Sequence, residues 1–334
     1  MKKIITLIAL ATVLTVSCKN SGKNNAVLPN VSGKAGEVLV VLDKADWEGN
    51  LGNEIRSSLG ALAPFLPQDE PLFTMVNIVP SGFSTMFKVH RNILYFNIDP
   101  QIGKSGILYK ENVWAYPQCV MQINGANADS AITIFKKNSS MIIGNLEQAE
   151  RNRIIANTMK YEERNLAPQV AQIAGGELHF PDGYKLKKKT ADFLWVADEK
   201  QYTNQGVFVY KYPALKSDNF TEKNIIGKRN EILKANVPGM FDNTYMTTST
   251  YQTPSITFLK YNGIQFAETR GFWEVYNDYM GGPFVSHSFY SKDGKDIIVL
   301  EAFVYAPKYD KRQYLRQVES LLYSFNWTDP AKKE

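Results

Sequence analysis

The feature that most constrains the fold is a run of five strand-like segments near the end of the chain, followed by one amphipathic helix. The segments cover residues 245–250, 255–261, 265–276, 284–290 and 296–305. Connections this short join antiparallel neighbours, because parallel strands need a crossover of a dozen or more residues. The helix begins near Asp310, and an apolar stripe follows at helical spacing: Tyr314, Leu315, Val318, Leu321, Leu322 and Phe325. This part of the chain is predicted to be an antiparallel sheet covered by its final helix.

The preceding residues mix strands and helices. Strand-like segments cover residues 37–42, 72–79, 93–98 and 113–123, and a helical stretch runs over 126–174 with expected breaks near Gly144 and Pro168. Gly175-Gly176 is the expected boundary between two halves, 36–174 and 175–328. Strands and helices that are segregated in this way indicate an α+β fold, with mostly antiparallel sheets and packed helices in two sandwich-like halves.

The N-terminus has the three parts of an export signal. Lys2 and Lys3 are followed by the apolar residues 4–16, a stretch too short to span a bilayer. Thr15-Val16-Ser17-Cys18 is similar to a bacterial lipoprotein cleavage box, although Thr15 stands where leucine is usual. We therefore expect residues 1–17 to be a signal peptide, Cys18 to carry a lipid, and residues 18–35 to be a polar tether. The alternative is an ordinary secretory signal in which Cys18 is incidental.

Lipidation of Cys18 predicts where the protein works. Lys19 follows the lipid site and no acidic run comes after it, a pattern that favours a lipoprotein of the outer membrane that faces the periplasm. Cys119 then has no disulfide partner, because the chain contains only two cysteines. The exported part is therefore expected to be held together by its core alone, and Cys119, in a strand-like segment, to be a buried inert thiol.

Composition and motifs exclude several classes of function. The net charge of +5 is too mild to indicate nucleic acid as a partner. The three histidines, His90, His179 and His287, lie far apart without the spacing of metal ligands. Neither a nucleophile elbow nor a phosphate-binding glycine loop is present, so the sequence calls for no metal and no cofactor.

A polar and aromatic cluster near residue 270 is the candidate binding surface. In this surface Arg270 is the expected directional hydrogen-bond donor and Trp273 the expected aromatic anchor. The surface also includes Met280, Gly281, Gly282, Pro283 and Phe284. The alternative is structural, because Arg270 can pair with Glu268 or Glu274 along its own strand. The glycine pair has a structural interpretation too, as a turn that needs positive φ.

Glu301 is the candidate for catalysis. It lies within an apolar strand, so that a central position would bury it and require a donor from a neighbouring strand. Arg270 and His287 are the expected partners. Such a trio is either a structural ion pair or, in an enzyme, a general acid or base whose pKa is raised by burial.

Several segments together resemble an uncharacterised lipoprotein family of Bacteroidetes, classed as a domain of unknown function. They are the lipoprotein signal and residues 67–71, 114–118, 270–273, 280–284 and 311–316. The closing order of hairpin strands and one amphipathic helix is similar to the PsbP-like and Mog1-like folds. This resemblance implies an envelope location and brings no catalytic residues.

The sequence thus favours a non-enzymatic lipoprotein, anchored to the membrane by lipid, that binds an envelope protein, a glycan or a lipid. The alternative is an envelope hydrolase that uses Glu301 with His287 or Arg270.

Overall fold

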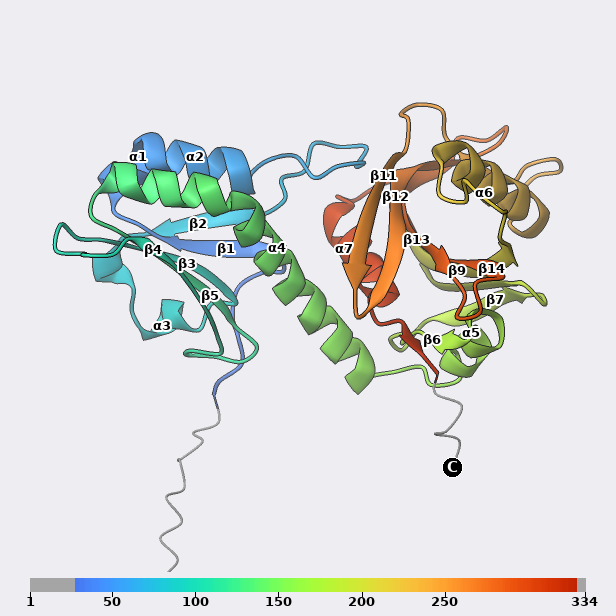
Figure 1. The fold of residues 1–334 in the computed structure, drawn as a ribbon, viewed down its shortest axis with the longest axis horizontal. Coiled ribbons are helices and arrows are strands. Elements are labelled where there is room, and N and C mark those ends of the chain that lie inside the picture. The colour runs from blue at the N-terminus through green and yellow to red at the C-terminus, as the bar shows by residue number, and fades with distance from the viewer. Residues whose placement is uncertain (1–27, 329–334) are drawn as a thin grey trace, which may run out of the picture.

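The computed structural model describes residues 28–328, which form two halves joined by one long helix (Figure 1). This helix, α4 (Ala128–Lys160), has 33 residues and begins with a capping box between Asn127 and Ser130. Its first turns lie on the first half and its last turns run toward the second. None of the helices in the described residues is both long and apolar enough to cross a membrane.

The first half is built on a five-stranded mixed sheet. In spatial order its strands are β2 (Thr74–Ile78), β1 (Glu37–Val41), β3 (Asn92–Ile98), β5 (Cys119–Gly125) and β4 (Gly106–Glu111). The first four run parallel and β4 is antiparallel to β5. Side chains alternate between the two faces of β1, so that Val38 and Val40 join one core cluster while Leu39 and Val41 join another.

Helices cover both faces of this sheet. One face packs against α2 (Asn50–Leu59) and α4, with the short α1 (Lys44–Glu48) beside them (Figure 1). On the other face, aromatic side chains come from the segment that holds the 3₁₀ turn η1 (Pro80–Gly82) and α3 (Thr85–Lys88), and from Trp114. Both faces are therefore buried, as parallel strands require.

The second half is an eight-stranded antiparallel sheet. Its path is β10 (Met246–Thr248), β12 (Ile264–Val275), β13 (Gly281–Tyr290), β14 (Asp296–Tyr305), β9 (Thr203–Pro213), β8 (Phe193–Lys200) and β7 (Lys185–Lys189), and β11 (Ser255–Tyr261) also pairs with β12. One face packs against α6 (Glu222–Asn236). The other packs against α5 (Ala167–Ala174) and α7 (Arg312–Leu322). The short strands β6 (Gly176–Glu177) and β15 (Asn326–Trp327) pair with each other.

The α+β class is confirmed, and the bounds of β11 and β14 agree with the predicted ones. The helical stretch is an exception, because α4 continues through Gly144, where no atom crowds the helix, and ends only at Lys160. Pro168 lies in the first turn of α5, where its missing N–H costs no hydrogen bond. Since α5 packs in the core of the second sheet, residues 167–174 lie with the second half and not, as expected, with the first.

No side chain of its own segment caps the final helix, α7. The carboxylate of Glu70, from the first half, accepts hydrogen bonds from the backbone N–H groups of Lys311 at 2.6 Å and Arg312 at 2.9 Å. An acidic group at this position satisfies two free donors and complements the helix dipole. The loop of residues 61–72 thus connects the two halves through the first turn of α7.

Candidate functional site

Cys18 lies outside the described residues, so its lipidation stays a prediction. Cys119 is fully buried on β5, and burial raises the pKa of its thiol to about 12. A thiol with so high a pKa is a poor nucleophile at neutral pH.

Arg270 lies on β12, and its guanidinium is held by two carboxylates. Nε donates to Glu268 Oε1 at 2.7 Å, and Nη2 donates to Glu319 Oε1 on α7 at 2.5 Å. Burial alone would lower the pKa of Arg270, but the charges of Glu319 and Glu268 outweigh burial and raise it. Arg270 therefore has the structural pairing that its strand pattern allowed, and it ties α7 to the sheet.

The expected binding surface around Arg270 does not exist as one surface. Trp273 is only 2% exposed and donates its Nε1–H to the Val304 carbonyl, while Phe284 is fully buried on β13. Gly281 and Gly282 begin β13 and form no turn; a Cβ on Gly282 would lie 2.1 Å from the Val304 oxygen. The prediction of an aromatic anchor here is wrong, because period-two alternation turns Trp273 and Phe284 into the core under α6. Neighbouring Pro283 is buried and Met280 half-buried.

Glu301 is fully buried on β14, and its partner is Arg229 of α6. The Arg229 Nη2 lies 2.7 Å and its Nε 3.0–3.1 Å from the Glu301 carboxylate oxygens, and both side chains are at most 1% exposed. Burial raises the pKa of Glu301, and the charge of Arg229 opposes this rise. The guanidinium also stacks on the Phe284 ring at 3.8 Å. A carboxylate sealed in this way has no access to a substrate.

The predicted partners of Glu301 lie on the opposite face of the sheet. His287 is paired in register with Leu300, and Arg270 with Val285, and both Leu300 and Val285 belong to the core under α7. The His287 Nε2 atom is 3.7 Å from Glu268 Oε2. Burial lowers the pKa of His287. The hydrolase arrangement of Glu301 with His287 or Arg270 is therefore wrong.

A concave cleft lies between the two halves. Its volume is about 680 Å³. One wall comes from residues 30–35, Arg91 and 116–117, the floor from the second part of α4, and the opposite wall from β8, β9 and α7. Ligand sites occur preferentially at such junctions between structural units.

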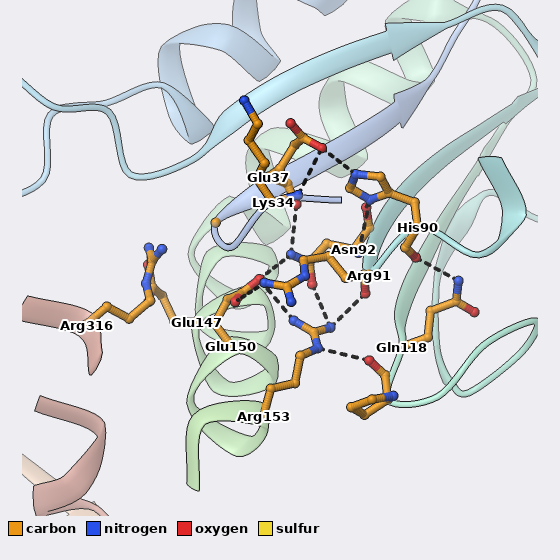
Figure 2. Close-up of polar contacts among 12 residues, drawn as sticks. Lys34, Glu37, His90, Arg91, Asn92, Gln118, Glu147, Glu150, Arg153 and Arg316 are labelled. Atoms are coloured by element: carbon orange, nitrogen blue, oxygen red, sulfur yellow. Dashed lines mark hydrogen bonds and ion pairs between the residues drawn. The ribbon is translucent and has the colours of Figure 1, made fainter. Parts of the chain in front are cut away.

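Glu150, on α4, is the centre of a buried polar network on the first-half side of the cleft (Figure 2). Only 1% exposed, it accepts hydrogen bonds from Arg91 Nη1 at 3.1 Å, Arg153 Nη1 at 3.0 Å and Asn92 Nδ2 at 2.8 Å. Arg153 also donates to the Pro117 and Arg91 carbonyls and to Asn92 Oδ1. Burial lowers the pKa of Arg153, although the charge of Glu150 opposes this effect.

Arg91 differs from Arg153 in how many of its donors are used. The single side-chain hydrogen bond of Arg91 within residues 28–328 is the one to Glu150, and its Nε is buried without a partner. A guanidinium has five N–H donors, so most of those on Arg91 are unused. Two guanidiniums share one carboxylate here, which leaves one positive charge at the wall of the cleft.

The other walls of the cleft carry amides, tyrosines and further charges. The carboxamide side chains are those of Asn30, Asn157, Gln205, Gln313 and Gln317. Asp198 is paired with Lys200 at 2.8 Å, while Tyr116 on the first-half wall is 58% exposed. No group of three His, Cys, Asp or Glu side chains in the described part of the chain is arranged to hold a metal ion. The site offers carboxamide groups for hydrogen bonding and a guanidinium that suits an acidic group.

Charges on a helix such as those of residues 126–174 ordinarily indicate a solvated face, so the sequence alone did not reveal this site. Glu147 does not pair with Arg151, which lies one turn further along α4. Instead it binds Arg316 of α7 through two hydrogen bonds of 2.7 and 3.0 Å, while Arg151 stacks on Tyr323 at 3.6 Å. The signal in the sequence that could have indicated this site is a long helix with charges all around, because such a helix often connects two units.

Comparisons with solved structures give low similarity. The Ran-binding protein Mog1p of Saccharomyces cerevisiae is 8% identical, with 47% of this chain and 92% of that chain covered and a TM-score of 0.31. A mutant of protein Mog1 is 10% identical, with 47% and 93% covered and a TM-score of 0.31. A structure from Bacteroides thetaiotaomicron is 9% identical, with 49% of each chain covered and a TM-score of 0.27.

Two family models match the chain, and they overlap within α4. Residues 31–159 match the domain of unknown function DUF8532, and residues 144–324 match the domain of unknown function DUF4837. The overlap reflects a helix that serves both halves. No curated protein matches the chain. Because the second model spans more than half of the sequence, the chain belongs to the DUF4837 family, a family of unknown function.

Proposed function

We propose that this chain is an envelope lipoprotein, anchored through Cys18, which binds a ligand with an acidic group in the cleft between its halves. The observation that carries the proposal is Arg91, which lines a cavity of about 680 Å³ and makes a single side-chain hydrogen bond within residues 28–328. An envelope protein, a glycan and a lipid can all carry such a group. Lys19, which follows the cleavage box without an acidic run, favours the periplasmic face of the outer membrane.

The neighbours of Arg91 support binding. Glu150 fixes one Nη of Arg91 and is itself held by Arg153 and Asn92, so that the guanidinium is oriented before a ligand arrives. A donor that is already oriented loses little conformational entropy on binding. A carboxylate or a phosphate is the group that matches the planar fork of a guanidinium.

We expect Arg91→Gln to lose molecules that co-purify with the protein. Lipidated protein would be extracted from its own membranes in mild detergent, and the small molecules released by denaturation would be quantified by mass spectrometry. A compound that is present with the wild type should fall about tenfold or more in the variant, since a charge-assisted hydrogen bond contributes about 1.5–3 kcal/mol.

Lys104→Gln is the matched control, because it removes one positive charge from an exposed position after β3, away from the cleft. This variant should retain the compound. An Arg91→Gln protein that melts normally and carries the same compounds as the wild type would remove Arg91 from the proposed site.

The anchor is tested by labelling cells with an alkyne fatty acid. We expect label on the wild type and on Cys119→Ala, and none on Cys18→Ala, because only Cys18 follows a cleavage box. Label that persists on the Cys18→Ala protein would contradict the proposed site of lipidation.

A further inference from the structure

The first described residues form a wall of the cleft and are fixed next to Arg91. The backbone of Tyr116 donates to Pro29 and accepts from Val31, while that of Ser32 donates to Val89 and accepts from Arg91, all at 2.8–3.2 Å. The point at which the chain enters the first half is therefore attached to the same residues that line the cleft.

The length of chain before this point limits how far the cleft lies from the proposed anchor. Cys18 precedes Leu28 by ten residues. Even a fully extended chain of that length spans at most about 35 Å, at roughly 3.3–3.6 Å per residue. A protein anchored at Cys18 thus keeps the wall of its cleft close to the lipid head groups.

The side chains near Arg91 are those of a site for an amphiphile. Apolar surface comes from Val31, Pro117, Ile154 and the exposed ring of Tyr116. Lys160 also lines the cleft, and its Nζ lies 5.1 Å from the ring of Tyr161, which is 55% exposed. Tyrosine and lysine are the residues that proteins place at the level of lipid head groups.

We propose that the cleft binds the phosphate head group of an anionic phospholipid from the bilayer in which the protein is anchored. Arg91 donates to the phosphate oxygens, and Tyr116 with its apolar neighbours contacts the adjoining glycerol and the start of the acyl chains. This inference rests on the proposed function, because it names the class of ligand for the same cleft.

The test places a photo-crosslinking phenylalanine at Tyr116 in the full lipidated protein, which is incorporated into vesicles of phosphatidylcholine alone or with added phosphatidylglycerol. The matched position is Tyr251, an exposed side chain of the second half. Cross-linked lipid is identified by mass spectrometry. A further sample contains phosphatidylglycerol vesicles with inorganic phosphate in the buffer, which separates a lipid phosphate from the free ion.

We expect position 116 to cross-link to phosphatidylglycerol in preference to phosphatidylcholine, at a yield that falls about tenfold with Arg91→Gln and is unchanged with Lys104→Gln. Position 251 should show no preference. Equal yields for the two lipids, or a yield that Arg91→Gln leaves unchanged, would overturn the lipid assignment. Loss of cross-linking in inorganic phosphate would assign the site to the free ion instead.

The outcomes also separate this inference from the proposed function. If a water-soluble compound co-purifies in an Arg91-dependent way and the cross-links show no lipid preference, the cleft is a binding site and the lipid assignment is wrong. If neither experiment depends on Arg91, both proposals fail.

Discussion

Replacement of Glu301 by glutamine is expected to lower the free energy of unfolding by about 3–5 kcal/mol. The change leaves the Arg229 guanidinium buried without a counter-charge, between the sheet and α6. The loss would be measured by urea denaturation, followed by the fluorescence of the buried Trp273.

The same helix supplies the control. Glu231 of α6 forms an exposed pair with Lys228 at 2.7 Å, so Glu231→Gln should cost only about 0–1 kcal/mol. The double variant Arg229→Met with Glu301→Leu removes both charges and should recover much of the loss. Equal effects of Glu301→Gln and Glu231→Gln would show that the buried pair does not hold α6 to the sheet.

Glu150→Gln should destabilise the first half by about 3 kcal/mol, because two guanidiniums then face each other without a carboxylate between them. The carboxylate joins α4 to the beginning of β3 through Arg91 and Asn92, and it also accepts from Arg153 of α4. Hydrogen exchange is the suitable measurement, since it resolves the two halves. Amides of β3 should exchange faster in the variant, while those of β13 change little.

Glu54→Gln is the control for this variant. Glu54 of α2 pairs with Lys136 of α4 at 3.1 Å, but Lys136 is largely exposed. Glu54→Gln should lower the free energy of unfolding by only about 0–1 kcal/mol. Unchanged exchange of β3 in Glu150→Gln would contradict the role of Glu150 as the centre of the network.

Local sequence patterns were sufficient for most of the second half. Asn262-Gly263 separates two strand-like runs, and both residues have the positive φ of a two-residue hairpin turn between β11 and β12. Likewise Thr221 is the N-cap of α6, and its hydroxyl accepts a hydrogen bond from the Asn224 N–H. These signals lie within a few residues of each other, so the sequence contains them directly.

Partners far apart in the sequence were not predictable in the same way. Alternation along β14 predicts that Glu301 is buried, but the strand pattern does not say which face it occupies or that Arg229, 72 residues away, approaches it. Arg270 and His287 were nearer in the sequence and lie on the wrong face. Periodicity sorts the side chains of a strand into two faces, but it does not say which element covers each face.

The candidate site depends on the same kind of information. Arg91 directly precedes β3, Glu150 lies on α4 and Gln317 on α7, and the three line one cleft because the second half packs beside α4. Isolated charges on a helix are usually solvated, so their ordinary interpretation was a solvent-exposed face. What distinguishes Glu150 is its burial, which follows from the packing of the complete chain.

The cap that Glu70 provides has a consequence for the order of assembly. Glu70 is synthesised 241 residues before Lys311, whose backbone N–H donates to the Glu70 carboxylate. Segments near the N-terminus are complete first during synthesis, and units generally fold in that order. When α7 emerges, its capping carboxylate is therefore already in place, and a first half that has not folded would leave α7 without a docking point.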